Sequence, residues 1–557
     1  MEKVDGKTTS TGSYKKVSDS KEGLKELNSK IDHDASEDKM LEEDTKFVTK
    51  NEAELKFISD EKKNGDAKVD IGNLKAGFVG MGKEELMRYA NDPFWIRLRW
   101  ILFILFWLVW LLMLAGAIGI IIAAPKCTAP QPRKWWEEGP LIDLNFFYNS
   151  ENNDTSVLQN IGAKNLILSG LEETYSLDND KDSYVQDIIK AGYKVILELT
   201  PGSTEQWFNA SVYRQEPYTN YYIWATSIPK HWVSPIRNSS SWVFSDERNE
   251  YYLKQYEKPD LNFRNKDVVE EFNKIIRHWL NLGVSGFRLS RVDRLLVDPE
   301  LRDESIGGVN SKASFDEPGY YTHKYTRNQE DLGEVLYPWR QIVHNLTNSE
   351  GVLMLTEDTE NLQPYTYNDT ILTIDLPSYA PIFNLENRTY SASKLARGIQ
   401  DSWAVLGSDN WPAWKYKAGT LSEDVLQILT FLLPGTPVIS TDIDKLKNSV
   451  ILNDLIKLRT SQTVLFGNYT TYLLQNDTIF AYTREKSGQP GYLVLCNPTS
   501  EIVTVDVTSI PSMSEDLTVS IVSQNFTTVK PKSKVLATAI TVPSKSAAVF
   551  TYVHAEN

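Results

Sequence analysis

Nine asparagines stand in Asn-x-Ser/Thr triplets in which x is not proline, the acceptor pattern for N-linked glycans. One such triplet means little, because the pattern is common by chance. All nine, however, lie in the last 410 residues of the chain, and none lies earlier. This distribution predicts glycan-compatible surface on one part of the chain only, at Asn153, Asn209, Asn238, Asn345, Asn368, Asn387, Asn468, Asn476 and Asn525.

The chain has two cysteines, which excludes an extracellular domain held together by many disulfides. Cys496 lies in the apolar run GYLVLCNP, where a small buried side chain is the expected role. Cys127 lies in the proline-marked segment APKCTAPQPRKWWEEGP, which has little fold of its own. We therefore predict a disulfide from Cys127 to another chain. A free or palmitoylated thiol and an internal pair with Cys496 are the alternatives.

One apolar stretch precedes Cys127 and divides the chain. Residues 100–124 read WILFILFWLVWLLMLAGAIGIIIAA, which is 25 residues without a charge. As a helix this stretch would be roughly 37 Å long, enough to cross a hydrocarbon core of about 30 Å. Ala115, Gly116 and Gly119 would let a neighbouring helix approach closely. It begins too far from the N-terminus for a cleavable signal peptide, so we predict an uncleaved signal anchor.

The glycan acceptors set the expected orientation, since basic residues lie on both sides of the span. They favour a type II membrane protein with a cytosolic N-terminus. Residues 1–81 are rich in Lys, Glu and Asp and poor in aromatic residues, which predicts a disordered cytosolic tail. Residues 82–99 predict a juxtamembrane helix, and residues 125–136 predict an extracellular linker. The net charge of −15 argues against binding nucleic acid.

The remaining chain predicts an α/β fold in two parts. Residues 137–465 alternate apolar strands with amphipathic helices, the pattern of a (β/α)8 barrel, with an aromatic-rich insertion at about 203–265. From 466 to 557 the pattern becomes period-two strands, which predicts a C-terminal antiparallel β domain. The eight expected barrel strands are 141–148, 165–170, 194–201, 286–292, 351–357, 371–375, 403–408 and 436–443.

Several motifs in the barrel region resemble the α-amylase/α-glucosidase family of glycoside hydrolases, especially insect maltases. They are VILELTPGSTEQWF, YYLKQYEKPDLNFRNKDVVEEF, GVSGFRLSRVDRLL, LGSDNWP and FLLPGTPVIS. The resemblance covers about residue 134 to the C-terminus. It implies a retaining mechanism in which an Asp nucleophile and a Glu acid/base lie about 5 Å apart.

The catalytic positions implied by this resemblance are degenerate. The fourth-strand motif keeps Arg288, but Ser290 stands where the nucleophilic Asp is expected. Glu357 matches the acid/base, and Asp409 aligns with the third carboxylate but lacks the usual preceding His. After the third strand, the family's Asp and Asn-His pair become Glu198, Gly202 and Ser203.

Ser290 decides the expected activity. A serine hydroxyl is uncharged at pH 7 and cannot stabilise an oxocarbenium-like transition state as a carboxylate does. Asp293 is a poor substitute, because side chains alternate along a strand and Asp293 lies beyond the strand end. Glu357 and Asp409 are then residual polar groups in a former cleft. We expect no metal, no cofactor and no hydrolysis.

The membrane half is similar to the heavy subunits of the heteromeric amino-acid transporters, through FWIRLRWILFILFWLVWLLMLAGAIGIIIAAPKC followed closely by KWW. The resemblance implies a plasma-membrane type II glycoprotein with an inactive glucosidase-like ectodomain, and Cys127 bridged to a polytopic light chain. The insertion after the third strand departs from the mammalian cell-surface antigen heavy chain. We expect a chain that escorts a transporter of neutral, leucine-type amino acids. A membrane-anchored α-glucosidase is the alternative, and a carbohydrate-binding receptor is a third possibility.

Overall fold

The computed structural model separates into two units, Met1–Cys127 and Thr128–Asn557. It describes residues 83–124, 131–145, 162–170, 179–202, 204–307, 313–384, 389–441 and 449–554. The predictions for the tail at 1–81, for Cys127, for Ser203 and for the acceptors Asn153 and Asn387 lie outside these residues.

The part of the first unit that the structure describes contains the helices α2 (Lys83–Ala90) and α3 (Pro93–Ala123). The Asp92 side chain caps α3 by accepting a hydrogen bond from the Phe94 amide at 3.0 Å, and Pro93 occupies the first helical position. The expected juxtamembrane helix is therefore interrupted before Pro93, and its last part is continuous with the apolar span in α3. Helix α3 has 31 residues and contains an 18-residue window with a mean hydropathy of 2.7, so it is long and apolar enough to cross a membrane.

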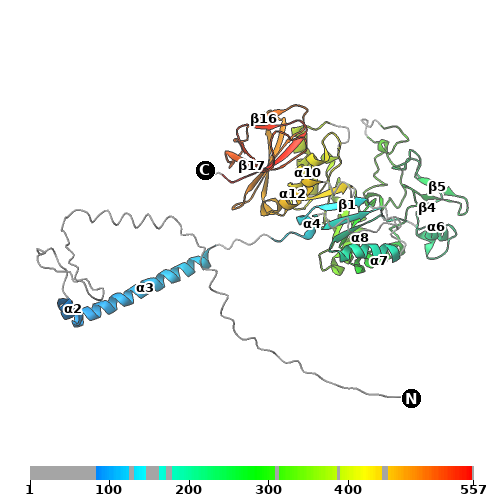
Figure 1. The fold of residues 1–557 in the computed structure, drawn as a ribbon. Helices are drawn as coiled ribbons and strands as arrows, with labels where there is room; N and C mark the ends of the chain where they lie inside the picture. The colour runs from blue at the N-terminus through cyan, green and yellow to red at the C-terminus, as the bar shows by residue number, and fades with distance from the viewer. Residues whose placement is uncertain are drawn as a thin grey trace, which may run out of the picture. The chain divides into compact units, whose positions relative to one another are not determined.

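The second unit begins with the predicted barrel, as Figure 1 shows. Parallel strands run in the order β11-β12-β1-β2-β3-β7-β8. Isolated parallel bridges, Met354 to Leu376 and Ser378 to Ala413, carry the ladder from β8 back to β11 and close it. The strands are β1 (Leu141–Asn145), β2 (Asn165–Ser169), β3 (Lys194–Leu199), β7 (Gly286–Leu289), β8 (Val352–Leu355), β11 (Ala413–Lys415) and β12 (Thr436–Thr441).

Helices and a short insertion sheet complete this part of the chain. The helices are α4 (Trp135–Glu138), α5 (Asn179–Lys190), α6 (Glu205–Val212), α7 (Lys266–Asn281), α8 (Leu332–Leu346), α9 (Ala392–Leu406), α10 (Glu423–Phe431), α12 (Val450–Arg459) and α13 (Gln462–Phe466). The insertion folds as β4 (Trp224–Ala225), β6 (Glu250–Leu253) and β5 (Trp242–Ser245), paired in that order. A hairpin of β9 (Thr366–Tyr367) and β10 (Ile371–Leu372) follows β8.

Two of the predicted barrel strands are wrong. Residues 403–406 form the end of helix α9, residues 407 and 408 follow it, and β11 is the seventh strand instead. At 371–375, Ile371 and Leu372 belong to the β9–β10 hairpin, and the barrel ladder runs through Leu376 and Ser378. A short apolar run does not distinguish a strand from a buried helix segment, which explains both errors.

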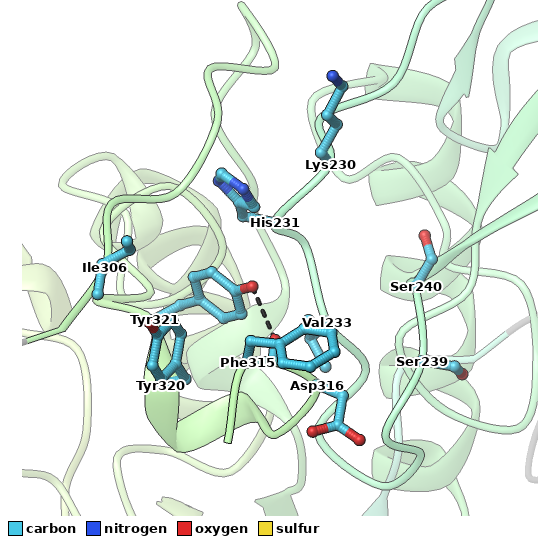
Figure 2. Close-up of a pocket in the computed structure, with 10 residues that line it drawn as sticks. All are labelled: Lys230, His231, Val233, Ser239, Ser240, Ile306, Phe315, Asp316, Tyr320 and Tyr321. Atoms are coloured by element: carbon cyan, nitrogen blue, oxygen red, sulfur yellow. Dashed lines mark hydrogen bonds between the residues drawn. The ribbon is translucent and has the colours of Figure 1, made fainter. Parts of the chain in front are cut away.

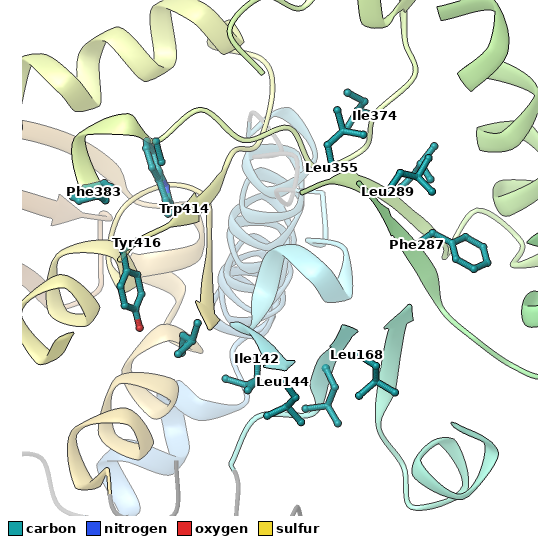
Figure 3. Close-up of a cluster of buried hydrophobic side chains, with 14 of the residues drawn as sticks. Ile142, Leu144, Leu168, Phe287, Leu289, Leu355, Ile374, Phe383, Trp414 and Tyr416 are labelled. Atoms are coloured by element: carbon teal, nitrogen blue, oxygen red, sulfur yellow. The ribbon is translucent and has the colours of Figure 1, made fainter. Parts of the chain in front are cut away.

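Alternation along the strands divides the core into two faces. Ile142, Leu168 and Phe287 pack with the surrounding helices in the largest cluster, part of which Figure 3 shows. Their neighbours along each strand face the barrel lumen, where they form a smaller cluster. It includes Trp136, Leu141, Ile167, Ile196, Met354 and Val438. Gly286 lies on the lumen face, where an added Cβ would be 2.2 Å from the Val352 carbonyl oxygen.

The C-terminal β domain matches the predicted antiparallel pattern. Its larger sheet has the order β13-β14-β15-β20-β17-β18, and β16 pairs with β19. The strands are β13 (Asn468–Leu474), β14 (Ile479–Glu485), β15 (Gly491–Asn497), β16 (Val503–Val505), β17 (Asp516–Val522), β18 (Lys534–Leu536), β19 (Ile540–Val542) and β20 (Ser546–Tyr552). Cys496 is fully buried on β15, as predicted.

Buried hydrogen bonds at the end of α10 join this domain to the barrel. The last carbonyls of a helix have no partner within the helix. Here the Phe431 carbonyl accepts from Arg459 at 2.7 Å, the Leu432 carbonyl accepts from Arg484 at 2.6 Å, and Leu429 accepts from the Tyr482 hydroxyl at 2.6 Å. The two cations therefore complete the helix terminus from inside the protein.

Candidate functional site

Polar side chains fill the lumen where the parallel strands end. Arg288 on β7 donates to Asp143 on β1 through both terminal nitrogens, at 2.6 and 3.0 Å, and also to Glu198 on β3. Ser169 on β2 donates to Asp143 at 3.0 Å. We call Asp143, Ser169, Glu198, Arg288 and Lys415 the polar layer. It lies at the carboxyl end of the barrel, where enzymes with this fold place their active sites.

Arg288 is the central cation of the polar layer. Its side chain is 5% exposed, and burial alone would favour the neutral form. Attraction to Asp143 and Glu198 outweighs burial and raises the pKa of Arg288. Arg288 thus neutralises carboxylates that would otherwise be available to a ligand, and the predicted positions Arg288 and Glu198 do come together.

Ser290 lies two residues after Arg288, so the alternation of side chains along a strand places both on the same face. It is buried, and its hydroxyl lies 2.5 Å from the Thr200 hydroxyl. Threonine is not a base at neutral pH, so this contact cannot activate Ser290 as a nucleophile.

Glu357 follows β8 and is held by the backbone beside Ser290. Its Oε1 accepts a hydrogen bond from the Arg291 amide at 2.6 Å, while its Oε2 is buried without a partner among the described residues. Burial raises the pKa of Glu357, and the nearby charge of Asp293 raises it further. A protonated carboxyl is what a glycosidase acid requires, but a nucleophile must face it for the reaction to proceed.

Asp293 lies beyond β7 in a short 3-10 turn, as the strand alternation predicts. Its Oδ2 accepts from Arg327 at 2.6 Å, while its Oδ1 is buried without a partner among the described residues. The side chain is therefore committed to an ion pair outside the polar layer.

Asp409 does not reach this site. It is exposed and lies in the loop before β11, whereas the polar layer is built at the ends of the strands. The alignment of Asp409 with the third carboxylate is therefore wrong, because it depended on a strand at 403–408, where the structure has the end of helix α9 and a turn. The residue at the end of the seventh strand is Lys415.

Lys415 and Asp143 are the site residues that the sequence analysis missed. The Lys415 ammonium donates to the Thr356 carbonyl at 2.6 Å and lies 3.4 Å from Asp358 Oδ1. Burial lowers the pKa of Lys415. A single charged residue inside an apolar strand was a usable signal for both, in LIDLN and AWKY. Among the described residues, no group of three or more His, Cys, Asp and Glu could hold a metal.

Replacing Glu357 with Gln should raise stability at neutral pH. Because the pKa of Glu357 is raised in the folded protein, the folded state binds the Glu357 proton more tightly than the unfolded chain does. Wild type therefore loses stability as pH rises from the pKa of the unfolded chain, about 4.3, through the raised pKa of the folded protein. The neutral amide avoids that loss. Thermal unfolding should show the variant above wild type at neutral pH, with the difference vanishing near pH 4.

The exposed carboxylate Asp409 supplies the control for this experiment. Asp409→Asn should follow the wild-type pH profile. The assigned role of burial would be contradicted if Glu357→Gln were less stable than wild type by the same amount at neutral and at acidic pH.

A concavity lined by residues outside the polar layer is shown in Figure 2. Its volume is about 480 Å³, and it is lined by residues of the insertion and of the segment before α8. His231 stacks on Tyr321 with ring centroids 5.2 Å apart, and the Tyr321 hydroxyl donates to the Phe315 carbonyl at 2.7 Å. No residue of the polar layer lines it, so we assign it no catalytic role.

The predicted sites outside the barrel have simple surroundings. On α3, which has no buried residue, a Cβ added to Gly116 or Gly119 would meet no described atom within 4 Å, and the helix contact at these residues stays a prediction. The acceptor asparagines within the described residues are all exposed: Asn209, Asn238, Asn345, Asn368, Asn468, Asn476 and Asn525.

Comparison with known proteins identifies two regions. Residues 66–142 match the family model "Solute carrier family 3 member 2 N-terminus", and residues 155–395 match "Alpha amylase, catalytic domain". The human amino acid transporter heavy chain SLC3A1 is 30% identical over 423 residues, which are 65% of this chain and 60% of that protein. This chain therefore spans about 60% of the length of the heavy chains it matches.

Glucosidases and related enzymes also match the barrel region. The salivary alpha-glucosidase of Anopheles gambiae is 33% identical over 302 residues, covering 48% of this chain and 50% of that enzyme. Among solved structures, the alpha-glucosyl transfer enzyme XgtA aligns with a TM-score of 0.59 at 14% identity, covering 76% of this chain and all of that one. The trehalose-6-phosphate hydrolase of Bacillus licheniformis aligns with a TM-score of 0.58 at 16% identity, covering 75% of this chain and all of that one. These structures support the fold alone.

Proposed function

Since the chain joins a solute carrier family 3 type N-terminal segment to an α-amylase-type domain, we propose that it is the heavy subunit of a heteromeric amino-acid transporter. It escorts and stabilises a polytopic light chain at the plasma membrane and supports transport of neutral, leucine-type amino acids. One span cannot form a substrate pathway, so the pore belongs to the partner.

One observation carries this proposal: the heavy-chain N-terminal segment and the barrel occur in a single chain. The matched segment, residues 66–142, includes all of α3 and reaches β1. Glucosidase-type enzymes account for the barrel, but not for a long apolar helix directly before it. The similarity to the SLC3A1 heavy chains of human and mouse supports the same function.

We propose that the barrel is catalytically inactive, and the polar layer supports this. Ser290 occupies the nucleophile position and bonds to a threonine hydroxyl, while Lys415 occupies the end of the seventh strand. The second candidate is a membrane-anchored α-glucosidase. It is favoured by the glucosidase relatives and by the raised pKa of Glu357, which suits a general acid.

The proposed orientation is type II, with the N-terminus in the cytosol and the second unit outside. Exposure of every described acceptor asparagine is consistent with glycans on that unit. Cys127 would then lie just outside the membrane, within reach of a loop of the light chain. A disulfide there raises the effective concentration of helix contacts made by Ala115, Gly116 and Gly119.

Replacing Cys127 with Ser should abolish the high-molecular-weight band on non-reducing gels of the full-length chain. Some co-precipitation of the light chain and some amino-acid uptake should remain, because the helix contacts persist without the bond. The measurement is affinity purification, non-reducing electrophoresis and mass spectrometry of the partner.

Cys496→Ser is the matched control, because this thiol is fully buried and should leave the band unchanged. The proposal fails if Cys127→Ser also leaves the band unchanged and cells lacking the chain take up amino acids normally.

A further inference from the structure

The larger sheet of the C-terminal domain ends at β13, a seven-residue strand that pairs with β14 on one side. Alternate backbone groups on its other side face away from the sheet. The strand reads NYTTYLL, which is rich in strong β-formers and contains neither a charge nor a proline. An outer strand of this length and composition is a template for pairing with another chain.

Packing holds β13 in place, and among the described residues no other strand pairs with its outer edge. Tyr469 packs on Trp403 of α9, with ring centroids 4.8 Å apart, and Tyr472 packs against the core of the β domain. The strand is therefore fixed in an extended form, and Leu473 remains 39% exposed. A rigid, extended strand pays little entropy when a second strand adds to it.

The opposite edge of the same sheet is protected in a familiar way. Strand β18 has three residues, and Lys530, Pro531, Lys532 and Lys534 lie in it or just before it, all exposed. Short length, lysine and proline are the usual devices that prevent strand addition at a sheet edge. Strand β13 has none of them, so its protection must come from elsewhere.

Glycan acceptors stand at both ends of β13. Asn468 is its first residue, in the triplet completed by Thr470, and Asn476 lies two residues after its last, in the triplet completed by Thr478. Both asparagines are exposed. The strand is about 20 Å long at roughly 3.3 Å per residue. A bulky N-linked glycan at each end would leave little of this edge open.

We propose that N-linked glycans at Asn468 and Asn476 protect the outer edge of β13 against strand addition by a second copy of the chain. Antiparallel addition of β13 to its own copy is self-complementary, so it would form a symmetric contact. The inference depends on the proposed type II orientation, which places this domain where glycans are attached.

The test uses two differently tagged copies of the full-length chain, co-expressed in animal cells and captured under reducing conditions. Asn468→Gln with Asn476→Gln should increase co-capture of the two tags several-fold over wild type. Thr470→Ala with Thr478→Ala removes the same glycans by another route and should give the same result. Hydrogen exchange should show new protection of the β13 amides in the associated form.

Two further variants separate edge protection from a general effect of glycans on folding. Asn209→Gln with Asn238→Gln removes two exposed acceptors from the insertion and should leave co-capture at the wild-type level. Adding Thr470→Lys to the Asn468→Gln, Asn476→Gln variant should restore that level, because a lysine blocks edge pairing without a glycan.

Unchanged co-capture in the Asn468→Gln, Asn476→Gln variant would overturn the inference, as would an equal increase in the Asn209→Gln, Asn238→Gln control or a failure of the added lysine. Glycopeptide mass spectrometry distinguishes failure of the edge inference from failure of the proposed orientation. Bare Asn468 and Asn476 beside occupied acceptors elsewhere would defeat the edge inference alone. A chain without any glycan would defeat the orientation.

Discussion

Replacing Arg288 with Ala should lower the free energy of unfolding by about 3–5 kcal/mol, the usual cost of removing one partner from a buried ion pair. Asp143 and Glu198 would then face each other across the lumen without the cation that bonds to both. The Asp143 and Glu198 side chains are only 12% and 18% exposed, so solvent would screen their mutual repulsion poorly. Denaturant unfolding of the full-length chain in detergent, followed by tryptophan fluorescence, would measure this loss.

An exposed ion pair provides the comparison. Lys274 bonds to Glu271 on the surface of α7 at 2.8 Å, and Lys274→Ala should leave unfolding almost unchanged. The triple variant Asp143→Asn, Glu198→Gln, Arg288→Met should be more stable than Arg288→Ala, because it leaves no buried charge unpaired. If Arg288→Ala unfolds like Lys274→Ala, the polar layer does not support the barrel.

The full-length chain should not hydrolyse maltose, sucrose or an aryl α-glucoside. Loss of a nucleophile typically lowers turnover by about 10⁴- to 10⁶-fold, which puts any residual rate below ordinary detection. Ser290→Asp alone should restore little. Both terminal nitrogens of Arg288 already donate to Asp143 and Glu198, Asp409 lies outside the site, and Lys415 stands at the end of the seventh strand.

Glu357→Gln tells true turnover from a contaminating glucosidase, since only activity of this chain depends on Glu357. A rate above about 1 s⁻¹, within the ordinary range of enzymes, that disappears in Glu357→Gln would establish the glucosidase alternative instead.

Strong periodic signals in the sequence predicted most of the architecture. The uncharged run at 100–124 predicted a helix long enough to span a membrane, and the structure has it within α3. The period-two pattern after 466 predicted the antiparallel sheet. Alternation placed Arg288 and Ser290 on one face and Asp293 beyond the strand end. In the structure Arg288 lies on β7, Ser290 directly follows the strand, and Asp293 lies in the 3-10 turn after it.

The errors arose where a short apolar run was ambiguous. WAVLGS has the composition of a strand, but Leu395, Ile399, Ser402 and Leu406 are buried at the spacing of a helix face. Because β11 is the seventh barrel strand, the residue at the end of that strand is Lys415 and not Asp409. Asp143 was missed for another reason: its partner Arg288 lies 145 residues away, and only the closed barrel brings them together.

The carbonyl groups at the end of α10 also constrain the order in which the chain matures during synthesis. Arg484 leaves the ribosome 52 residues after Leu432, the carbonyl it satisfies, and Arg459 leaves it 28 residues after Phe431. Until both have emerged, the nascent barrel ends α10 on carbonyls that have neither a protein donor nor, once buried, water. We therefore expect the barrel to reach its final packing only after Arg484 of the β domain has left the ribosome.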